Sequence, residues 1–125
     1  MNRSVAVVCS AAIILMAGVF IQACNKNSSN PVSPVPGADV TITIVGINGN
    51  MSFSPNPSTA KVGQKVAWRN SGGTTHTATA DGGAFNTGSI ANGSTSTPIT
   101  MGTAGAFGYH CSFHPSMVGT LNVTP

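Results

Sequence analysis

Charged residues are scarce in this chain. Only seven of its 125 residues are charged, five Lys or Arg and two Asp or Glu, and their share of 6% lies far below the roughly 25% of an average soluble domain. The four basic residues after residue 23 are too few to follow a nucleic-acid backbone, which excludes nucleic-acid binding. Asp39 and Asp81 are the only carboxylic acids, so acid–base catalysis lacks support and we do not expect an enzyme.

Cysteines and helical periodicity are also limited. Three cysteines are an odd number, so disulfides cannot account for all of them and each thiol needs its own explanation. No stretch after residue 38 keeps a helical period over three turns. The chain is instead rich in four residue types, with 14 Ser, 14 Thr, 15 Gly and 8 Pro. This composition is typical of short strands joined by turns. The length suits one domain.

The N-terminal segment indicates export. Arg3 is followed by an apolar run over residues 5–21, and this pattern predicts a signal peptide over residues 1–23. The next residues resemble a bacterial lipobox, with Ile21 three positions before Cys24 and a small residue directly before the cysteine. The resemblance implies that Cys24 carries a lipid and begins the mature protein. A plain cleaved signal and an uncleaved membrane anchor are the alternatives.

The rest of the chain divides into a tether and one folded domain. Residues 24–37 hold three prolines among Asn and Ser and lack apolar periodicity, so we expect an extended tether. From residue 38 onward the pattern alternates with a period of two, as in Val40, Ile42 and Ile44. Several such runs, separated by turn residues, predict an all-β fold for residues 38–125, an antiparallel β-sandwich of about seven or eight strands.

Three candidate metal ligands stand at a regular spacing near the C-terminus. Cys111, His114 and Met117 offer a thiolate, an imidazole and a thioether, each three residues after the last. Donors of this kind suit copper, whereas a structural zinc site usually takes four Cys or His ligands. The spacing therefore predicts a copper site. The alternative is a buried thiol, a surface His and a core Met that are three residues apart by chance.

A fourth ligand must come from elsewhere in the chain, which has two other histidines, His76 and His110. Because neighbouring residues of a strand point to opposite faces, His110 cannot reach an ion held by Cys111. His76 is therefore predicted to complete a set of two His and one Cys with a weak axial Met117, the arrangement of electron-transfer copper centres. We expect His110 to be a partly exposed strand residue, with a role in conducting electrons from Cys111 as the alternative.

Residues 40–125 resemble the cupredoxins, the small blue copper proteins, and are most similar to the amicyanin and plastocyanin type. The resemblance rests on the ligand loop, on the residues before it and on an upstream framework: Tyr109, His110, Cys111, His114, Pro115, Met117 and Gly119, with Gly105 and Phe107, and with Val62, Val66, Trp68 and Asn70. It implies a Greek-key β-sandwich with a buried His76 and with the edge of His114 near the surface. Phe113 replaces a loop proline of amicyanin.

Thr77 also departs from the cupredoxin pattern. The family often has an Asn at this position, and its side chain helps to tie the first ligand strand to the Cys loop. Either the hydroxyl of Thr77 takes over this tie or the loop is looser. The same resemblance implies an apolar collar around His114, formed by the ligand loop. Met51 of a neighbouring loop either joins this collar or packs in the core.

These observations predict a periplasmic one-electron carrier with a single blue copper centre that cycles between Cu(I) and Cu(II). Its expected partners are periplasmic redox proteins that dock near His114, and the lipid on Cys24 would hold a monomer at a membrane. Two alternatives are a copper storage or delivery protein and an electron-transfer subunit of a larger oxidoreductase. Because charges are so few, we expect partner association to depend weakly on salt.

Overall fold

The structure, a computed structural model, describes residues 35–125. This part of the chain holds eight short strands and one turn of 3-10 helix. In chain order the elements are β1 (Val40–Ile44), η1 (Gly49–Met51), β2 (Phe53–Ser54), β3 (Ser58–Lys61), β4 (Lys65–Asn70), β5 (Thr79–Ala80), β6 (Ile99–Thr100), β7 (Gly105–His110) and β8 (Val118–Thr124).

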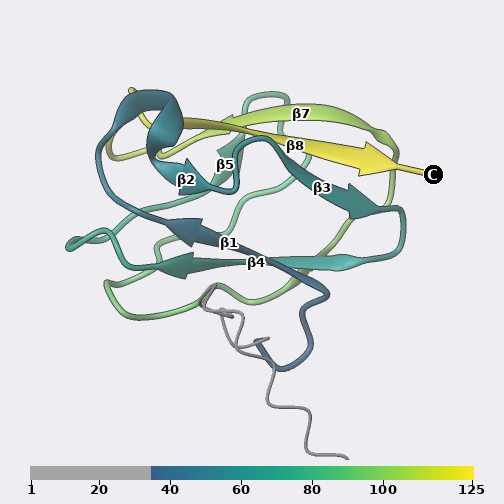
Figure 1. Cartoon of the computed structure of the whole chain (residues 1–125), viewed down its shortest axis with the longest axis horizontal. Coiled ribbons are helices and arrows are strands. Elements are labelled where there is room, and N and C mark those ends of the chain that lie inside the picture. Colours follow the sequence, from purple (N-terminus) through teal and green to yellow (C-terminus); the bar gives the residue numbers. More distant parts are fainter. Residues whose placement is uncertain (1–34) are drawn as a thin grey trace, which may run out of the picture.

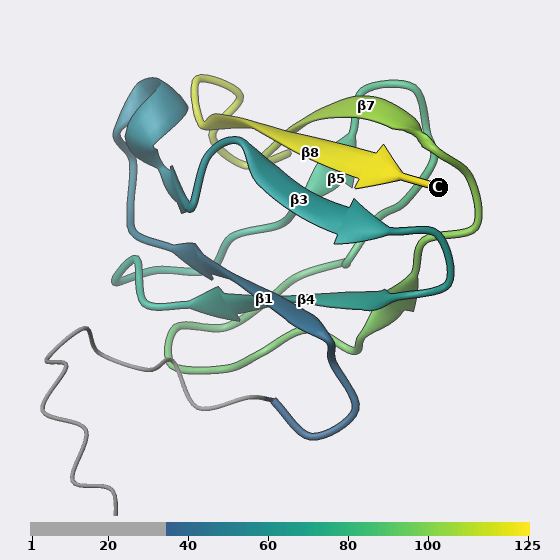
Figure 2. The same ribbon diagram turned by 45° about the vertical axis from the view of Figure 1, so that its right-hand side comes forward.

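The strands form two four-stranded sheets that lie face to face (Figure 1). Their orders are β2-β1-β4-β6 and β3-β8-β7-β5, which confirms the predicted all-β sandwich. The sheets are mixed, however, because β1 pairs with β4 and β3 pairs with β8 in parallel. A parallel pair needs a crossover connection. Here the chain between β1 and β4 passes through β3 of the other sheet (Figure 2).

The core lies between the sheets and follows the predicted alternation. Ile42 and Ile44 of β1 are fully buried, whereas the other residues of this strand are only half-buried. Trp68 of β4 and Tyr109 of β7 are also fully enclosed, and their ring centroids lie 5.8 Å apart in an edge-on arrangement. Phe53 of β2 also packs against Tyr109, with the ring centroids 4.7 Å apart. Aromatic contacts therefore join the two sheets close to the point where β7 ends.

The N-terminal predictions concern residues outside the described part of the chain. The signal peptide over residues 1–23, the lipid on Cys24 and most of the tether over residues 24–37 therefore stay predictions from the sequence. Among residues 35–125, the structure contains no helix that is both long enough and apolar enough to cross a membrane.

Candidate metal centre

Three of the predicted ligands meet at one end of the sandwich. His76 lies in the segment between β4 and β5, Cys111 directly follows β7, and His114 belongs to the loop between β7 and β8, which lies at the end opposite the C-terminus (Figure 1). The Sγ of Cys111 is 3.6 Å from Nδ1 of His76 and 3.8 Å from Nδ1 of His114. The possible ligand atoms of all three residues lie within 4.8 Å of one another. Metal bonds of about 2.0 to 2.3 Å place atoms of one coordination shell at roughly such separations.

The spacing of three residues reflects two successive turns in the ligand loop. The N–H of His114 donates to the carbonyl oxygen of Cys111 at 3.2 Å, and the N–H of Met117 donates to that of His114 at 2.9 Å. Bonds between residues three apart are typical of β-turns. The N–H of Cys111 then donates to the carbonyl oxygen of Met117 at 3.1 Å. The loop is thus closed on itself, and the side chain of Met117 is fully buried.

The two imidazoles have different surroundings. His76 is fully buried and His114 is half-buried, as expected, and their ring centroids lie 5.1 Å apart. Burial lowers the pKa of His76, the backbone of Gly72 acts in the opposite direction, and the neighbouring His114 lowers the pKa further. A neutral imidazole is the form that binds a metal ion. His76 therefore offers a free lone pair at neutral pH.

The far side of His76 rests against Gly72. A Cβ atom at this glycine would lie 2.8 Å from Nε2 of His76 and 3.1 Å from the Cα of Gly46. Nε2 is buried, and it makes no hydrogen bond of good geometry with the described residues, the Gly72 backbone included. Close packing against Gly72 on one side and the contact of Nδ1 with the Sγ of Cys111 on the other therefore set the ring position.

Asn70, the last residue of β4, shapes the segment that leads to His76. Its buried side chain donates to the carbonyl oxygens of Thr74 and Ile90 at 2.7 and 2.8 Å, and its Oδ1 accepts from the N–H of Gly72 at 2.9 Å. Side-chain bonds to a local backbone commonly replace ladder bonds where a strand ends. One amide thus holds both ends of the turn that places Gly72 against the imidazole.

Thr77 connects the His76 segment to the cysteine loop. Its backbone N–H donates to the Sγ of Cys111 at 3.4 Å, and its hydroxyl oxygen accepts from the N–H of Ser112 at 2.8 Å. The same hydroxyl lies 3.2 Å from that of Thr79, which in turn lies 3.0 Å from the hydroxyl of Ser112. Of the two possibilities raised by the sequence, the structure shows the first, in which the Thr77 hydroxyl ties the two segments together.

The other residues singled out by the sequence lie outside the cluster of His76, Cys111 and His114. His110 points away from the cluster and contacts Asp81, as the strand alternation requires. Phe113 and Met51 are 55% and 64% exposed, so Met51 is a surface residue and not a core residue. The sequence reasoning missed the contacts of Gly72 and Asp81. Asn70 is one of the residues that resemble the cupredoxins, but the sequence does not predict that its side chain holds the turn before His76.

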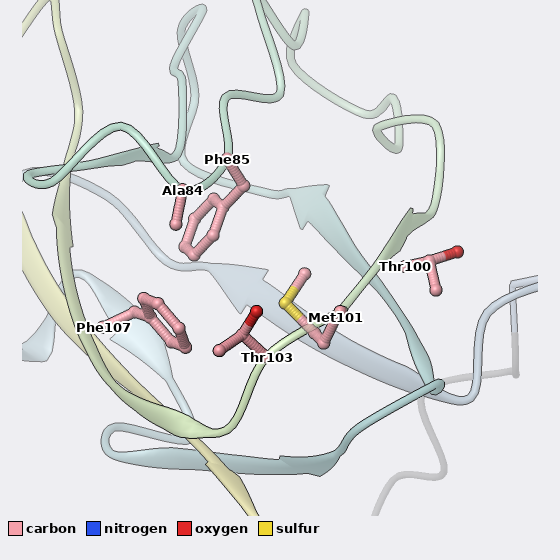
Figure 3. Close-up of a pocket in the computed structure, with 7 residues that line it drawn as sticks. Ala84, Phe85, Thr100, Met101, Thr103 and Phe107 are labelled. Carbon is pink, nitrogen blue, oxygen red and sulfur yellow. The ribbon is translucent and has the colours of Figure 1, made fainter.

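A separate pocket of about 190 Å³ lies between Phe85, Phe107, Met101 and Thr103 (Figure 3). No residue that lines it is charged, and none belongs to the His and Cys cluster. The pocket is therefore separate from the candidate metal centre.

The donor set of the cluster has a clear chemical preference. It combines one buried thiol with two imidazole nitrogens, and the buried thioether of Met117 lies on the same loop. Cys111 is a free cysteine in the structure. A thiolate with two imidazoles and a weak thioether is typical of copper electron-transfer centres, and a structural zinc site would require a fourth strong ligand.

The chain is similar to known copper proteins both in its sequence family and in its fold. Residues 40–124 match the family model for copper binding proteins of the plastocyanin/azurin family. A solved purple cupredoxin from Nitrosopumilus maritimus is 26% identical, with a TM-score of 0.60, and the match covers 69% of this chain and 100% of that chain. A reduced Cu(I) form of an amicyanin variant is 24% identical, with a TM-score of 0.59, over 73% of this chain and 86% of that one. This second likeness supports the fold alone. No curated protein sequence matches the chain.

Proposed function

Because the chain belongs to the plastocyanin/azurin family of copper-binding proteins, we propose that it carries single electrons on one copper ion held by His76, Cys111, His114 and Met117. The observation that carries this proposal is the buried Sγ of Cys111 with imidazole nitrogens of two histidines nearby, at 3.6 and 3.8 Å. The buried side chain of Met117 and the turn that joins this residue to His114 support its inclusion in the proposed set.

The protein scaffold suits electron transfer because it holds the donor atoms in place. The copper ion, when bound, supplies a one-electron couple between Cu(I) and Cu(II). The turns of the ligand loop and the N–H of Thr77 fix the sulfur, while Gly72 and Asn70 fix His76. Burial of Cys111 and His76 keeps water from the sulfur. A shell that does not rearrange between oxidation states favours rapid electron exchange.

The surface around His114 suits a transient partner. His114 is half-buried, and exposed apolar side chains lie on its own loop and on the loop before β2: Phe113, Val45, Ile47 and Met51. The loops over residues 45–52, 71–75 and 111–117 contain no charged residue. Small apolar contacts with little charge allow quick release. We propose that redox partners dock here and receive electrons through His114.

The cellular setting is proposed from the sequence alone. The predicted signal peptide, the lipidated Cys24 and the tether over residues 24–37 support an exported protein that is held at a membrane of the cell envelope, in the periplasm. A free thiol such as Cys111 needs protection in that oxidising compartment. Burial of Cys111 is consistent with this requirement. We propose that the carrier acts as a monomer.

The test uses the full-length chain without metal. Addition of Cu(II) should produce an intense blue thiolate-to-copper band at one equivalent and reversible one-electron cycling. Cys111→Ser should abolish the band, while Cys9→Ser and Cys24→Ser, the matched controls, should keep it. Absence of the band in the native chain would overturn the proposal. Copper that passes readily to a chelator without reversible cycling would favour storage or delivery instead.

A further inference from the structure

Asp81 and His110 form a pair on the outer face of the sheet, beside the proposed copper centre. The Nδ1 of His110 lies 2.6 Å from Oδ1 of Asp81, and their side chains are 33% and 63% exposed. A carboxylate only accepts hydrogen bonds, so Nδ1 of the imidazole carries the hydrogen and donates it. Bonds to a charged acceptor are shorter and stronger than bonds between neutral groups. Nothing in the proposed copper-binding set uses this pair.

Gly108 provides the space that the carboxylate of Asp81 occupies. A Cβ atom at Gly108 would lie 2.8 Å from Oδ2 of Asp81, so any side chain there would displace the carboxylate. The backbone of Gly108 is not in the left-handed region, so the position has no conformational need for glycine. The N–H of Asp81 donates to the carbonyl oxygen of Gly108 at 2.9 Å. The glycine thus accommodates both the backbone and the side chain of Asp81.

The pair strengthens a weak point of the sheet. β5 is an edge strand of two residues, and it pairs with β7 only through Thr79 with His110 and Ala80 with Tyr109. A strand of this length has few ladder bonds of its own. Yet β5 continues the segment of His76 and Thr77, and Thr77 supplies the hydrogen bond to the sulfur of Cys111.

Cys111 lies between two residues that are tied to this same segment. On one side, His110 is bound to Asp81 at 2.6 Å. On the other side, the N–H of Ser112 is bound to the hydroxyl of Thr77 at 2.8 Å. The residues before and after the cysteine are therefore both tied to residues 77–81, one through its side chain and one through its backbone. Two anchors fix the distance between the sulfur and the N–H of Thr77 better than one.

We propose that Asp81 and His110 are positioning residues that hold Cys111 in register with Thr77. The inference rests on the proposed function, because it concerns the sulfur that would bind copper. It predicts that loss of the pair weakens the hydrogen bond from Thr77 to Sγ. That bond withdraws electron density from the sulfur and favours the reduced state, so its loss lowers the reduction potential.

The experiment compares four single variants of the full-length chain. Asp81→Ala removes the bond and the charge, Gly108→Ala displaces the carboxylate but keeps the charge, and Asp81→Asn removes the charge but keeps an acceptor oxygen. Asp39→Ala is the control, because it removes the other carboxylate, which accepts from the N–H of Lys65 at 2.8 Å. The first readout is hydrogen exchange at the amide of Thr77 in the metal-free protein.

We expect Asp81→Ala and Gly108→Ala to speed exchange at Thr77 by roughly two- to tenfold, the effect of losing one ordinary hydrogen bond. Asp39→Ala should leave it unchanged, and Asp81→Asn, whose amide oxygen accepts a weaker bond than a carboxylate, should speed it less than Asp81→Ala does. The double variant Asp81→Ala/His110→Ala should show no more effect than Asp81→Ala alone, because loss of either side chain removes the same bond. Unchanged exchange in Asp81→Ala, or an Asp81→Asn variant that behaves like Asp81→Ala, would overturn the inference.

The second readout is the reduction potential of the copper-loaded protein. The reduction potential should fall in Gly108→Ala, which keeps the charge. It should be lower in Asp81→Ala than in Asp81→Asn, because both variants lose the charge and only the first loses the acceptor oxygen. If the native chain shows no blue band, the proposed function fails, while the exchange data still decide whether Asp81 positions Cys111. If the native band is present and all four variants keep the native potential and exchange rate, the inference on Asp81 fails and the proposed function stands.

Discussion

The backbone N–H of Thr77 donates to the Sγ of Cys111 at 3.4 Å, and these residues are 34 positions apart in the chain. The residue directly before Thr77 is His76, whose Nδ1 lies 3.6 Å from the same sulfur. One short segment therefore supplies both a candidate ligand and a hydrogen bond to a second candidate ligand. The position of the sulfur relative to the imidazole is thus set by the protein itself.

The hydroxyl of Thr77 should contribute to this arrangement. Thr77→Ala leaves the N–H of Ser112 without its acceptor, so we expect a loss of about 1 kcal/mol in the free energy of unfolding. It should also shift the blue band, because the cysteine loop loosens. Urea unfolding and the absorption spectrum measure the two effects. Thr77→Ser keeps the hydroxyl and should restore both. A Thr77→Ala protein with native stability and a native spectrum would show that the tie is unimportant.

Gly72 should be necessary for the native position of His76. A Cβ at Gly72 would lie 2.8 Å from Nε2 and 3.0 Å from Cδ2 of His76, so Gly72→Ala pushes the ring out of place. We expect copper affinity to fall by about tenfold or more, measured by competition with a chelator. Gly82→Ala is the matched control, because its Cβ would meet no atom within 4 Å. Equal affinities in the two variants would contradict this account.

Tyr109 should titrate only at very high pH. Burial of its phenol raises the pKa from 10.0 to about 12, and the nearby Trp68 side chain acts in the opposite direction. The folded pKa lies above the unfolded one, so this group leaves stability unchanged below pH 10.0 and lowers it as the pH rises toward about 12. Tyr109 is the only tyrosine, so phenolate absorbance in folded and urea-unfolded protein reports it directly.

The control for this titration is Tyr109→Phe. The variant lacks the ionising group, and it should not show the loss of stability that Tyr109 contributes at alkaline pH. A phenol that ionises at the same pH in folded and unfolded protein would show that Tyr109 is not enclosed as described.

Electron self-exchange should depend weakly on salt, because the loops around His114 carry no charged residue. We expect the rate to change by less than about twofold between low and physiological ionic strength. NMR line broadening in mixtures of reduced and oxidised protein measures it. Ser116→Lys adds a charge at an exposed position of the ligand loop. This variant should slow exchange at low salt and make it salt-dependent. A steep salt dependence in the native protein would place charges at the contact surface.

The candidate ligands could be predicted because their chemistry and spacing are local. Cys111, His114 and Met117 stand three residues apart, and each step is one turn of the ligand loop in the structure. His76 followed from the alternation of strand side chains, which turns His110 to the opposite face. The core residues Ile42 and Ile44 followed from the same alternation.

Other features depend on contacts between distant segments, which no local pattern reveals. The parallel pairing of β1 with β4 requires the chain to cross between sheets. The contact of Gly72 with the His76 ring depends on how the segment after Asn70 folds back. The pairing of Asp81 with His110 needs the register of β5 on β7. The sequence allows Met51 to lie either in the apolar collar or in the core, and only the packing of the folded chain determines that it is exposed.

The sequence by itself determined the type of fold, the kind of donor atoms and the copper that suits them, because residue type and periodicity express these properties directly. It also carries the predictions of export and lipid attachment. Only the tertiary structure decided how the donors are held. Their separations come from hydrogen bonds and close packing between segments up to 35 residues apart, and these exist only once the two sheets have come together.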